Sequence, residues 1–491
     1  MKNFSRSLIW LTFSEIFFTA AGYIIHSALG RILAPADYGR YSLIITLTTM
    51  IVILIGNGIP TAMSKYLSEI FERDPAQIHK IKRKTIKLQA SLMLGVTIIF
   101  FLSSPLLAYI LGDPSLTPLF RISAFIIPAF AAASFYFYYY TGLHFFRLQS
   151  ILKVTRACGR IVFIIGLAYF FGVKGAISGY IVAPLFVFTV ALICDMSITH
   201  RYFPATKIQD DSLGDKLSTK KILTYAWPLT LFLLFYELIS TIDLYFVKAL
   251  LHSDHLTGIY NAVITAGRIP YFLFYALTII LLPAISKTTS ERNDIETTSL
   301  INRSLRLMVF ILFPLIALLA IYSKQTILLI YGPEYLEAMI PMGIYVIGAG
   351  FLTVFYVLSF VLNGAGLVKI PMWITFWGLL LNIILNFLLI PRYELIGASY
   401  AVIIVSLILM ISSLFYIKKH FQVHLPLMLW LISIFSIAVI TLIAKILPYG
   451  SWSFILSSIV LIMIYFGILR ISGQFTDDDM GMFLKLKKKT T

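Results

Sequence analysis

Apolar runs long enough to cross a lipid bilayer recur from one end of this chain to the other. Hydrophobic residues make up 59% of the 491 residues, and charged residues make up only 12%. An α-helix needs about 20 predominantly apolar residues to cross the hydrocarbon core. The strands of a membrane β-barrel would instead give short segments of alternating polarity. The sequence therefore predicts an all-α polytopic membrane protein.

The apolar runs predict about fourteen transmembrane helices. Their approximate ranges are 8–29, 41–63, 88–110, 119–141, 157–173, 176–199, 227–250, 257–283, 304–323, 339–363, 371–390, 396–417, 427–447 and 452–471. The first run follows Lys2 and Arg6, as the apolar part of a signal peptide would, but it is longer than that region normally is. We therefore interpret it as a retained span.

Positive charge is unevenly shared between the loops. When successive loops are assigned alternately to two sides, most of the 39 lysines and arginines fall on one side, together with both termini. Cytoplasmic loops carry this excess, so we expect a multi-pass protein of the cytoplasmic (inner) membrane with both termini in the cytoplasm. Basic loops attract anionic membrane lipids. Membrane lipids, and not nucleic acid, are therefore the expected partners of the net charge of +17.

A pattern of polar residues near the N-terminus recurs in the middle of the chain. Each member has a counterpart 222 residues later: Glu15, Thr19, Tyr23 and His26 correspond to Glu237, Thr241, Tyr245 and Lys248. Other matches lie at similar offsets: Gly39 with Gly258, Gly112 with Gly332, and Gly175 with Gly397. Six spans per copy give both copies the same orientation, as in a parallel repeat of transporter halves.

The duplication divides the chain into two pseudo-symmetric six-helix lobes and an extension. The expected parts are an N-terminal lobe (1–200), a cytoplasmic linker (201–222), a C-terminal lobe (223–420), two additional transmembrane helices (421–471) and a cytoplasmic tail (472–491).

Two loop motifs carry a resemblance to a known family. The segment Leu29–Tyr41, LGRILAPADYGRY, resembles the loop between the first two spans of polysaccharide transporters. Tyr331–Ala338, YGPEYLEA, resembles the turn before their tenth span. With its length, span number and duplication, the chain is similar to the flippases for lipid-linked O-antigen repeat units. These belong to the multidrug/oligosaccharidyl-lipid/polysaccharide exporter superfamily.

The resemblance implies two lobes around a central cavity lined by the first, second, seventh and eighth spans, with access alternating as the lobes rock. Lipid II flippases of the same superfamily carry cationic residues in that cavity on the first, second and eighth spans. In this sequence only the eighth span has a clear match, Arg268.

Arg268 is the leading candidate for binding a phosphate-bearing headgroup, with Asn261 on the same face of its helix. A guanidinium can bind a phosphate or pyrophosphate through two parallel hydrogen bonds without losing its charge. Alternatively, Arg268 pairs with Glu237 or Asp243 and joins two helices.

Arg31 is a further headgroup candidate near the outer end of the first span. The alternative for Arg31, and for His26, Lys174 and Lys248, is that the side chain extends to the membrane interface while its stem packs on apolar surface.

Three acidic residues are candidates for ion coupling: Glu15, Glu237 and Asp243. An ionised group at the bilayer centre costs roughly 2.5–3.5 kcal/mol on insertion scales, so it normally faces a cavity or a partner. As functional groups they would bind a coupling proton or Na⁺. As structural groups they would pair with basic side chains, and Asp243 can pair with Lys248 in this way.

The predicted function is that of a flippase and not of an enzyme. We expect it to move an undecaprenyl-pyrophosphate-linked oligosaccharide repeat unit, such as an O-antigen unit of lipopolysaccharide, from the cytoplasmic to the outer leaflet. The sequence has no GxxxxGK[ST] motif for a nucleotide, and we expect no cofactor, catalytic residue or metal site. Membrane potential, worth about 2.3 kcal/mol per charge per 100 mV, and/or H⁺ or Na⁺ antiport would drive it.

Two alternatives stay open, together with further partners. One is a multidrug/cation antiporter of the same fold, which would need an acidic cavity. The other is a non-transporting scaffold of a polysaccharide assembly complex. A polysaccharide polymerase and other assembly proteins are the expected partners beside the carrier lipid.

Overall fold

Helices form nearly all of the chain that the computed structural model describes. The described residues are 2–56, 58–70, 78–202, 219–421, 423, 427–448, 450, 453–476 and 479, and no strand occurs among them. Most of the predicted linker (203–218) and most of the predicted tail, including 480–491, lie outside these ranges. The all-α polytopic fold predicted from the sequence is confirmed.

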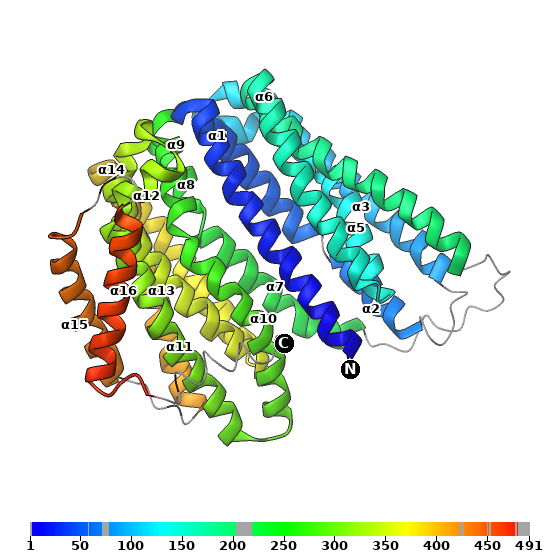
Figure 1. The fold of residues 1–491 in the computed structure, drawn as a ribbon. Coiled ribbons are helices and arrows are strands. Elements are labelled where there is room, and N and C mark those ends of the chain that lie inside the picture. Colours follow the sequence, from blue (N-terminus) through cyan, green and yellow to red (C-terminus); the bar gives the residue numbers. More distant parts are fainter. Residues whose placement is uncertain are drawn as a thin grey trace. The chain divides into compact units, whose positions relative to one another are not determined.

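The elements follow the chain in this order (Figure 1): α1 (Lys2–Gly56), α2 (Gly58–Ile70), α3 (Ile78–Ile110), η2 (Pro114–Leu116), α4 (Thr117–Ser123), α5 (Ile126–Gly142), α6 (Phe146–Tyr202), α7 (Thr219–Ile239), α8 (Ile242–Leu251), α9 (Asp254–Gly267), α10 (Ile269–Ser290), α11 (Asp294–Ile321), α12 (Ser323–Ile330), η3 (Pro333–Ala338), α13 (Met339–Gly364), α14 (Lys369–His420), α15 (Leu427–Ala444) and α16 (Ser453–Ile471).

Three helices are long enough for two spans each, and one sharp bend divides each of them into two arms. In α1 the bend is at Ala34 (φ 57°, ψ 167°), in α6 at Gly172 (φ 58°, ψ −138°) and in α14 at Glu394 (φ 49°, ψ −127°). Pro35 follows the first bend and cannot continue the hydrogen-bond ladder of the preceding turn. Gly172 and Glu394 lie 222 residues apart, the offset of the repeat, so the two halves turn at equivalent positions.

Ten helical stretches in the described part of the chain are long and apolar enough to cross a membrane. Three of them are the bent helices, each long enough for two spans. Counting each bent helix as two spans, and adding the pair α9 and α10 at the predicted eighth span, agrees with the fourteen spans expected from the sequence.

The chain forms two compact units. The first comprises Met1–Thr224 together with Leu244–Asn261, and the second comprises Tyr225–Asp243 together with Ala262–Thr491. Within the first unit, α1 packs along α6, and α5 packs against α2 and α6. An aromatic cluster of α5, formed by Phe135, Tyr136, Tyr139 and Tyr140, fills its interior.

The second unit is built around α13, whose buried faces contact α10, α11 and α14. The two additional helices α15 and α16 pack against α11 in this unit, as Figure 1 shows. The Tyr465 hydroxyl of α16 donates a hydrogen bond of 3.0 Å to the carbonyl oxygen of Val309 in α11. Arg306 of α11 also binds Asp479 with Nε–Oδ1 at 3.0 Å. Asp479, which belongs to the predicted cytoplasmic tail, is buried.

Candidate functional site

A cavity of about 490 Å³ lies inside the first unit, between α1, α5 and α6. Its charged lining consists of Glu15 from α1 and of Lys153, Arg156 and Arg160 from α6. Aromatic rings of α1, α5 and α6 form most of the remaining wall. With three cations and one carboxylate, the lining has a net positive charge within a predominantly apolar span.

The three basic residues share one face of α6 because they are spaced at i, i+3 and i+7. Lys153 forms an ion pair with Glu15. The side chain of Thr49, also in the lining, donates a hydrogen bond of 2.7 Å to the carbonyl oxygen of Ile45 in its own helix. Because Glu15 pairs with Lys153, it neutralises one of the three cations of the cavity, and Arg156 and Arg160 give the lining its net positive charge.

Arg156 is the least exposed of the three cations, with 7% of its surface accessible. Its guanidinium lies over the ring of Phe130, with the Cζ atom 4.0 Å from the ring centroid, and Phe18 and Phe137 lie within 6 Å. Among the described residues, its Nε has no hydrogen-bond acceptor. A buried donor without an acceptor costs about 1–3 kcal/mol, and more when it is charged.

Arg160 continues the aromatic lining along the same face of α6. Its Cζ atom lies 4.6 Å from the ring centroid of Phe18 and 5.6 Å from that of Tyr180. Cations over aromatic faces are held in place by the ring quadrupole without being neutralised. The cavity thus holds two guanidinium groups over aromatic rings, and among the described residues neither has a carboxylate within ion-pair distance.

The second unit contains the other copy of the repeated glutamate. Arg268 lies at the junction between α9 and α10, and its guanidinium nitrogen is 3.7 Å from the carboxylate of Glu237. The guanidinium also lies over the ring of Tyr271, at 5.6 Å from its centroid. Tyr236 and Tyr356 pack against Tyr271.

Both repeated glutamates therefore have a basic partner, as the structural alternative for them required. The partners come from non-equivalent positions, Lys153 of α6 for Glu15 and Arg268 for Glu237. Thr49, the approximate counterpart of Arg268 in the repeat, lines the same cavity as Glu15.

The other predicted site residues lie apart from this cavity. Asn261 is buried in the first unit, and its Nδ2 has no acceptor among the described residues. Arg31 is exposed on α1. Asp243 is fully buried in the second unit, in the first turn of α8.

The expectations for Lys248 were wrong. Its side chain neither extends to the membrane interface nor pairs with Asp243. It is 3% exposed, donates to Asp113 Oδ2 at 2.9 Å and forms an ion pair with Asp254. Asp254 also accepts a hydrogen bond of 2.6 Å from Arg40 Nε. These four residues of the first unit form an ionic chain, which we call the Lys248 cluster.

Glycine allows the backbone segments of the Lys248 cluster to approach closely. A Cβ atom on Gly39 would lie 2.3 Å from the carbonyl oxygen of Asp254, and one on Gly258 would lie 1.8 Å from that of Pro35. The two glycines are equivalent in the repeat, so the equivalent loops of the two copies pack directly on each other.

The pH dependence of stability tests the Lys248 cluster. Burial disfavours the charged form of Asp113, but hydrogen bonds from Ser115 and Lys248 outweigh it and lower its pKa below the ordinary value. The contribution of ionised Asp113 to the stability of the folded protein is therefore complete above about pH 4, the pKa of an unfolded aspartate. It disappears as the pH falls through the lowered folded value. We expect the unfolding temperature of the wild type to exceed that of Asp113→Asn by a constant amount between pH 5 and 8. In stronger acid the two unfolding temperatures should converge. Convergence near neutral pH would contradict this.

Sequence reasoning missed Lys153 and Arg156 as site residues. It assigned both to a cytoplasmic loop, because the fifth span was expected to begin at residue 157. The helix α6 begins at Phe146 instead, and it carries both side chains into the cavity. The i, i+3, i+7 spacing of the three cations was the signal that could have revealed them.

The bent helices, the duplicated turns and the charged cavity within the first unit define a polytopic helical transporter. Two families match the chain, each over more than half of its length: polysaccharide biosynthesis protein over residues 4–289, and lipid II flippase MurJ over residues 160–469. The chain belongs to the flippases of polysaccharide and lipid-linked precursors in the multidrug/oligosaccharidyl-lipid/polysaccharide exporter superfamily. It is a transporter and not an enzyme.

Individual relatives are distant but cover most of the chain. The uncharacterized membrane protein MJ1375 of Methanocaldococcus jannaschii is 25% identical and covers 84% of this chain and 99% of its own. The lipid II flippase MurJ of Bacillus subtilis is 24% identical, covering 81% and 78%. A structure of lipid II flippase MurJ in an inward closed conformation superposes with a TM-score of 0.71 at 16% identity, covering 95% and 98%.

Proposed function

We propose that this protein flips an undecaprenyl-pyrophosphate-linked oligosaccharide from the cytoplasmic to the outer leaflet of the cytoplasmic membrane, with both termini in the cytoplasm. One observation carries the proposal: the cavity of the first unit presents Arg156 and Arg160 with only one carboxylate nearby. Pyrophosphate matches this lining because its oxygens accept parallel hydrogen bonds from guanidinium groups. Arg268 in the second unit, with Asn261 and Arg31, stays a proposed further contact to the headgroup.

The net charge of the cavity also separates this function from that of a multidrug/cation antiporter. A cationic drug entering the cavity would meet Lys153, Arg156 and Arg160 and only one carboxylate, Glu15. Like charges in a site of low dielectric repel strongly. An anionic lipid headgroup would instead be attracted by the same three cations.

An O-antigen or capsular repeat unit and an associated polymerase fit this proposal, because the family includes polysaccharide biosynthesis proteins.

Transport in reconstituted vesicles tests the proposal directly. Vesicles would contain the purified chain and a fluorescent undecaprenyl-pyrophosphate oligosaccharide, and an enzyme or quencher outside would report its arrival in the outer leaflet. We expect flipping that exceeds that of protein-free vesicles, and no uptake of ethidium as a cationic drug. Uptake of ethidium without lipid movement would favour the antiporter. If the vesicles showed neither lipid movement nor ethidium uptake, the result would favour the non-transporting scaffold.

Glu15 and Glu237 are proposed to couple transport to an ion, with Asp243 as a third candidate. Each glutamate can release its basic partner to the substrate phosphate and take up a proton or Na⁺ instead. We expect the double variant Glu15→Gln/Glu237→Gln to keep flipping driven by membrane potential and to lose its response to an imposed pH or Na⁺ gradient. An unchanged gradient response would remove both residues from coupling. Asp294→Asn, an exposed acidic change at the start of α11, is the matched control.

A further inference from the structure

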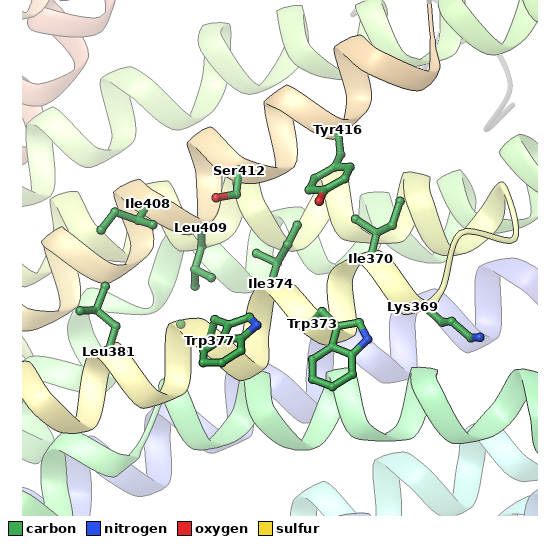
Figure 2. Close-up of a pocket in the computed structure, with 11 residues that line it drawn as sticks. Lys369, Ile370, Trp373, Ile374, Trp377, Leu381, Ile408, Leu409, Ser412 and Tyr416 are labelled. Carbon is green, nitrogen blue, oxygen red and sulfur yellow. The ribbon is translucent and has the colours of Figure 1, made fainter.

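A groove separates the two arms of α14 in the second unit. The arms are the parts of α14 before and after the bend at Glu394, and the groove between them has a volume of about 470 Å³. Figure 2 shows Leu409 and Tyr416 projecting from the second arm toward the first, and Lys369 at the beginning of the first arm. None of the lining residues belongs to the cavity of the first unit or to the Glu237–Arg268 pair.

The two arms approach closely at Gly378. A Cβ atom on Gly378 would lie 2.5 Å from Cδ2 of Leu409, so a larger residue there would displace the leucine side chain. Figure 2 shows the lining side chains of the two arms facing the space between them. The walls are apolar or aromatic, and Trp373 and Trp377 are 52% and 63% exposed. An apolar crevice on membrane-spanning helices favours hydrocarbon over water.

One end of the groove carries a cation, Lys369. Among the described residues, the ammonium group of Lys369 has no carboxylate within ion-pair distance, and no hydrogen bond occupies the hydroxyl of Tyr416. Lys369 is also the first residue of α14, where the helix dipole adds partial positive charge. Lys418 and Lys419 lie in the last turn of the same helix. Because α14 folds back at its bend, these basic residues lie at the same end of the two arms.

We propose that this groove is a binding site for an anionic phospholipid of the membrane. One acyl chain lies along Trp373, Trp377 and Leu381, and the phosphate contacts Lys369 with Tyr416 as a hydrogen-bond donor. The basic end of the helix pair is the end that the positive-inside rule places at the cytoplasmic leaflet, where anionic lipids attract basic residues. Tryptophan and tyrosine are the residues that favour the headgroup level. The bound lipid is distinct from the transported molecule, because the groove shares no residue with the transport site.

Native mass spectrometry of the purified full-length protein tests the site. The delipidated protein would be offered phosphatidylglycerol and phosphatidylcholine with identical acyl chains, and the last lipid retained on activation would be identified. We expect wild type to retain phosphatidylglycerol with a preference of about fivefold or more, as expected for one lysine at the surface. Lys369→Gln should abolish the preference. Lys418→Gln removes the same charge at the same end, outside the groove, and should keep it.

A second variant tests the apolar part of the groove. Ser412→Phe places a ring in the crevice, and we expect it to reduce retention of both lipids while thermal stability in detergent stays unchanged. The proposal is overturned if wild type shows no preference, or if Lys418→Gln loses the preference as Lys369→Gln does. It is also overturned if undecaprenyl phosphate displaces phosphatidylglycerol from wild type at equal concentration, since the groove would then belong to the carrier lipid.

Discussion

Replacing Arg156 by glutamine is expected to reduce flipping of the lipid-linked oligosaccharide by roughly 30- to 150-fold, because one or two charge-assisted hydrogen bonds to the phosphate are lost, at about 2–3 kcal/mol in total. The large effect follows from burial. Arg156 is almost completely enclosed by aromatic rings, and its Nε has no acceptor in the described part of the protein. Initial rates in the vesicle assay, at equal amounts of reconstituted protein, measure the change.

A matched variant separates this effect from a general loss of positive charge. Arg121 is an exposed arginine of α4 in the same unit, and its guanidinium packs over Phe101, outside the cavity. Arg121→Gln should therefore flip at the wild-type rate. Arg156→Lys should recover only part of the activity, since an ammonium group cannot bind phosphate through two parallel hydrogen bonds. Equal rates for Arg156→Gln and wild type would exclude the cavity as the phosphate site.

Lys248→Met is expected to destabilise the protein by about 3–5 kcal/mol, the range measured when one partner of a buried ion pair is removed. The substitution leaves Asp113 with no cation and Asp254 with Arg40 alone. Apolar burial by the methionine offsets little of this, because the two partly buried carboxylates lose their main counter-charge. Thermal unfolding in detergent, followed by the loss of soluble protein, measures the effect.

Two further variants define the cause of the loss. Lys174→Met removes a lysine that is exposed on α6 of the same unit, and it should leave stability within about 0.5 kcal/mol of wild type. Lys248→Arg keeps the charge and should retain most of the stability. If Lys248→Met unfolded at the same temperature as Lys174→Met and wild type, the Lys248 cluster would contribute nothing to the stability of the fold.

The sequence was sufficient for the fold because hydropathy and duplication are properties of long segments. Span length depends on bilayer thickness, and the repeat at an offset of 222 residues was visible in the sequence as matches such as Gly175 with Gly397. The structure adds that the two halves bend near these glycines, at Gly172 and Glu394. The pairing of Arg268 with Glu237 was foreseen as one of two alternatives. It could be foreseen because both residues lie deep in apolar segments, where a lone charge is costly.

The candidate site was harder to predict, because it depends on where a helix begins. Lys153 and Arg156 follow a short polar stretch and resemble loop residues, whereas tertiary packing extends α6 back to Phe146. The partners of Lys248 were also out of reach. Asp113 lies 135 residues away in sequence, in the turn that follows α3, and only the tertiary fold brings it to Lys248. No local spacing rule relates two such residues.

All cationic contacts that we assign to the cavity come from a single compact unit, through Lys153, Arg156 and Arg160. A movement of one unit against the other would carry this set of ligands along without taking it apart. The contacts from these three residues would then be as strong at the end of transport as at its start. Unloading would need a competitor, such as the carboxylate of Glu15 returning to Lys153 or a counter-ion from the opposite solution.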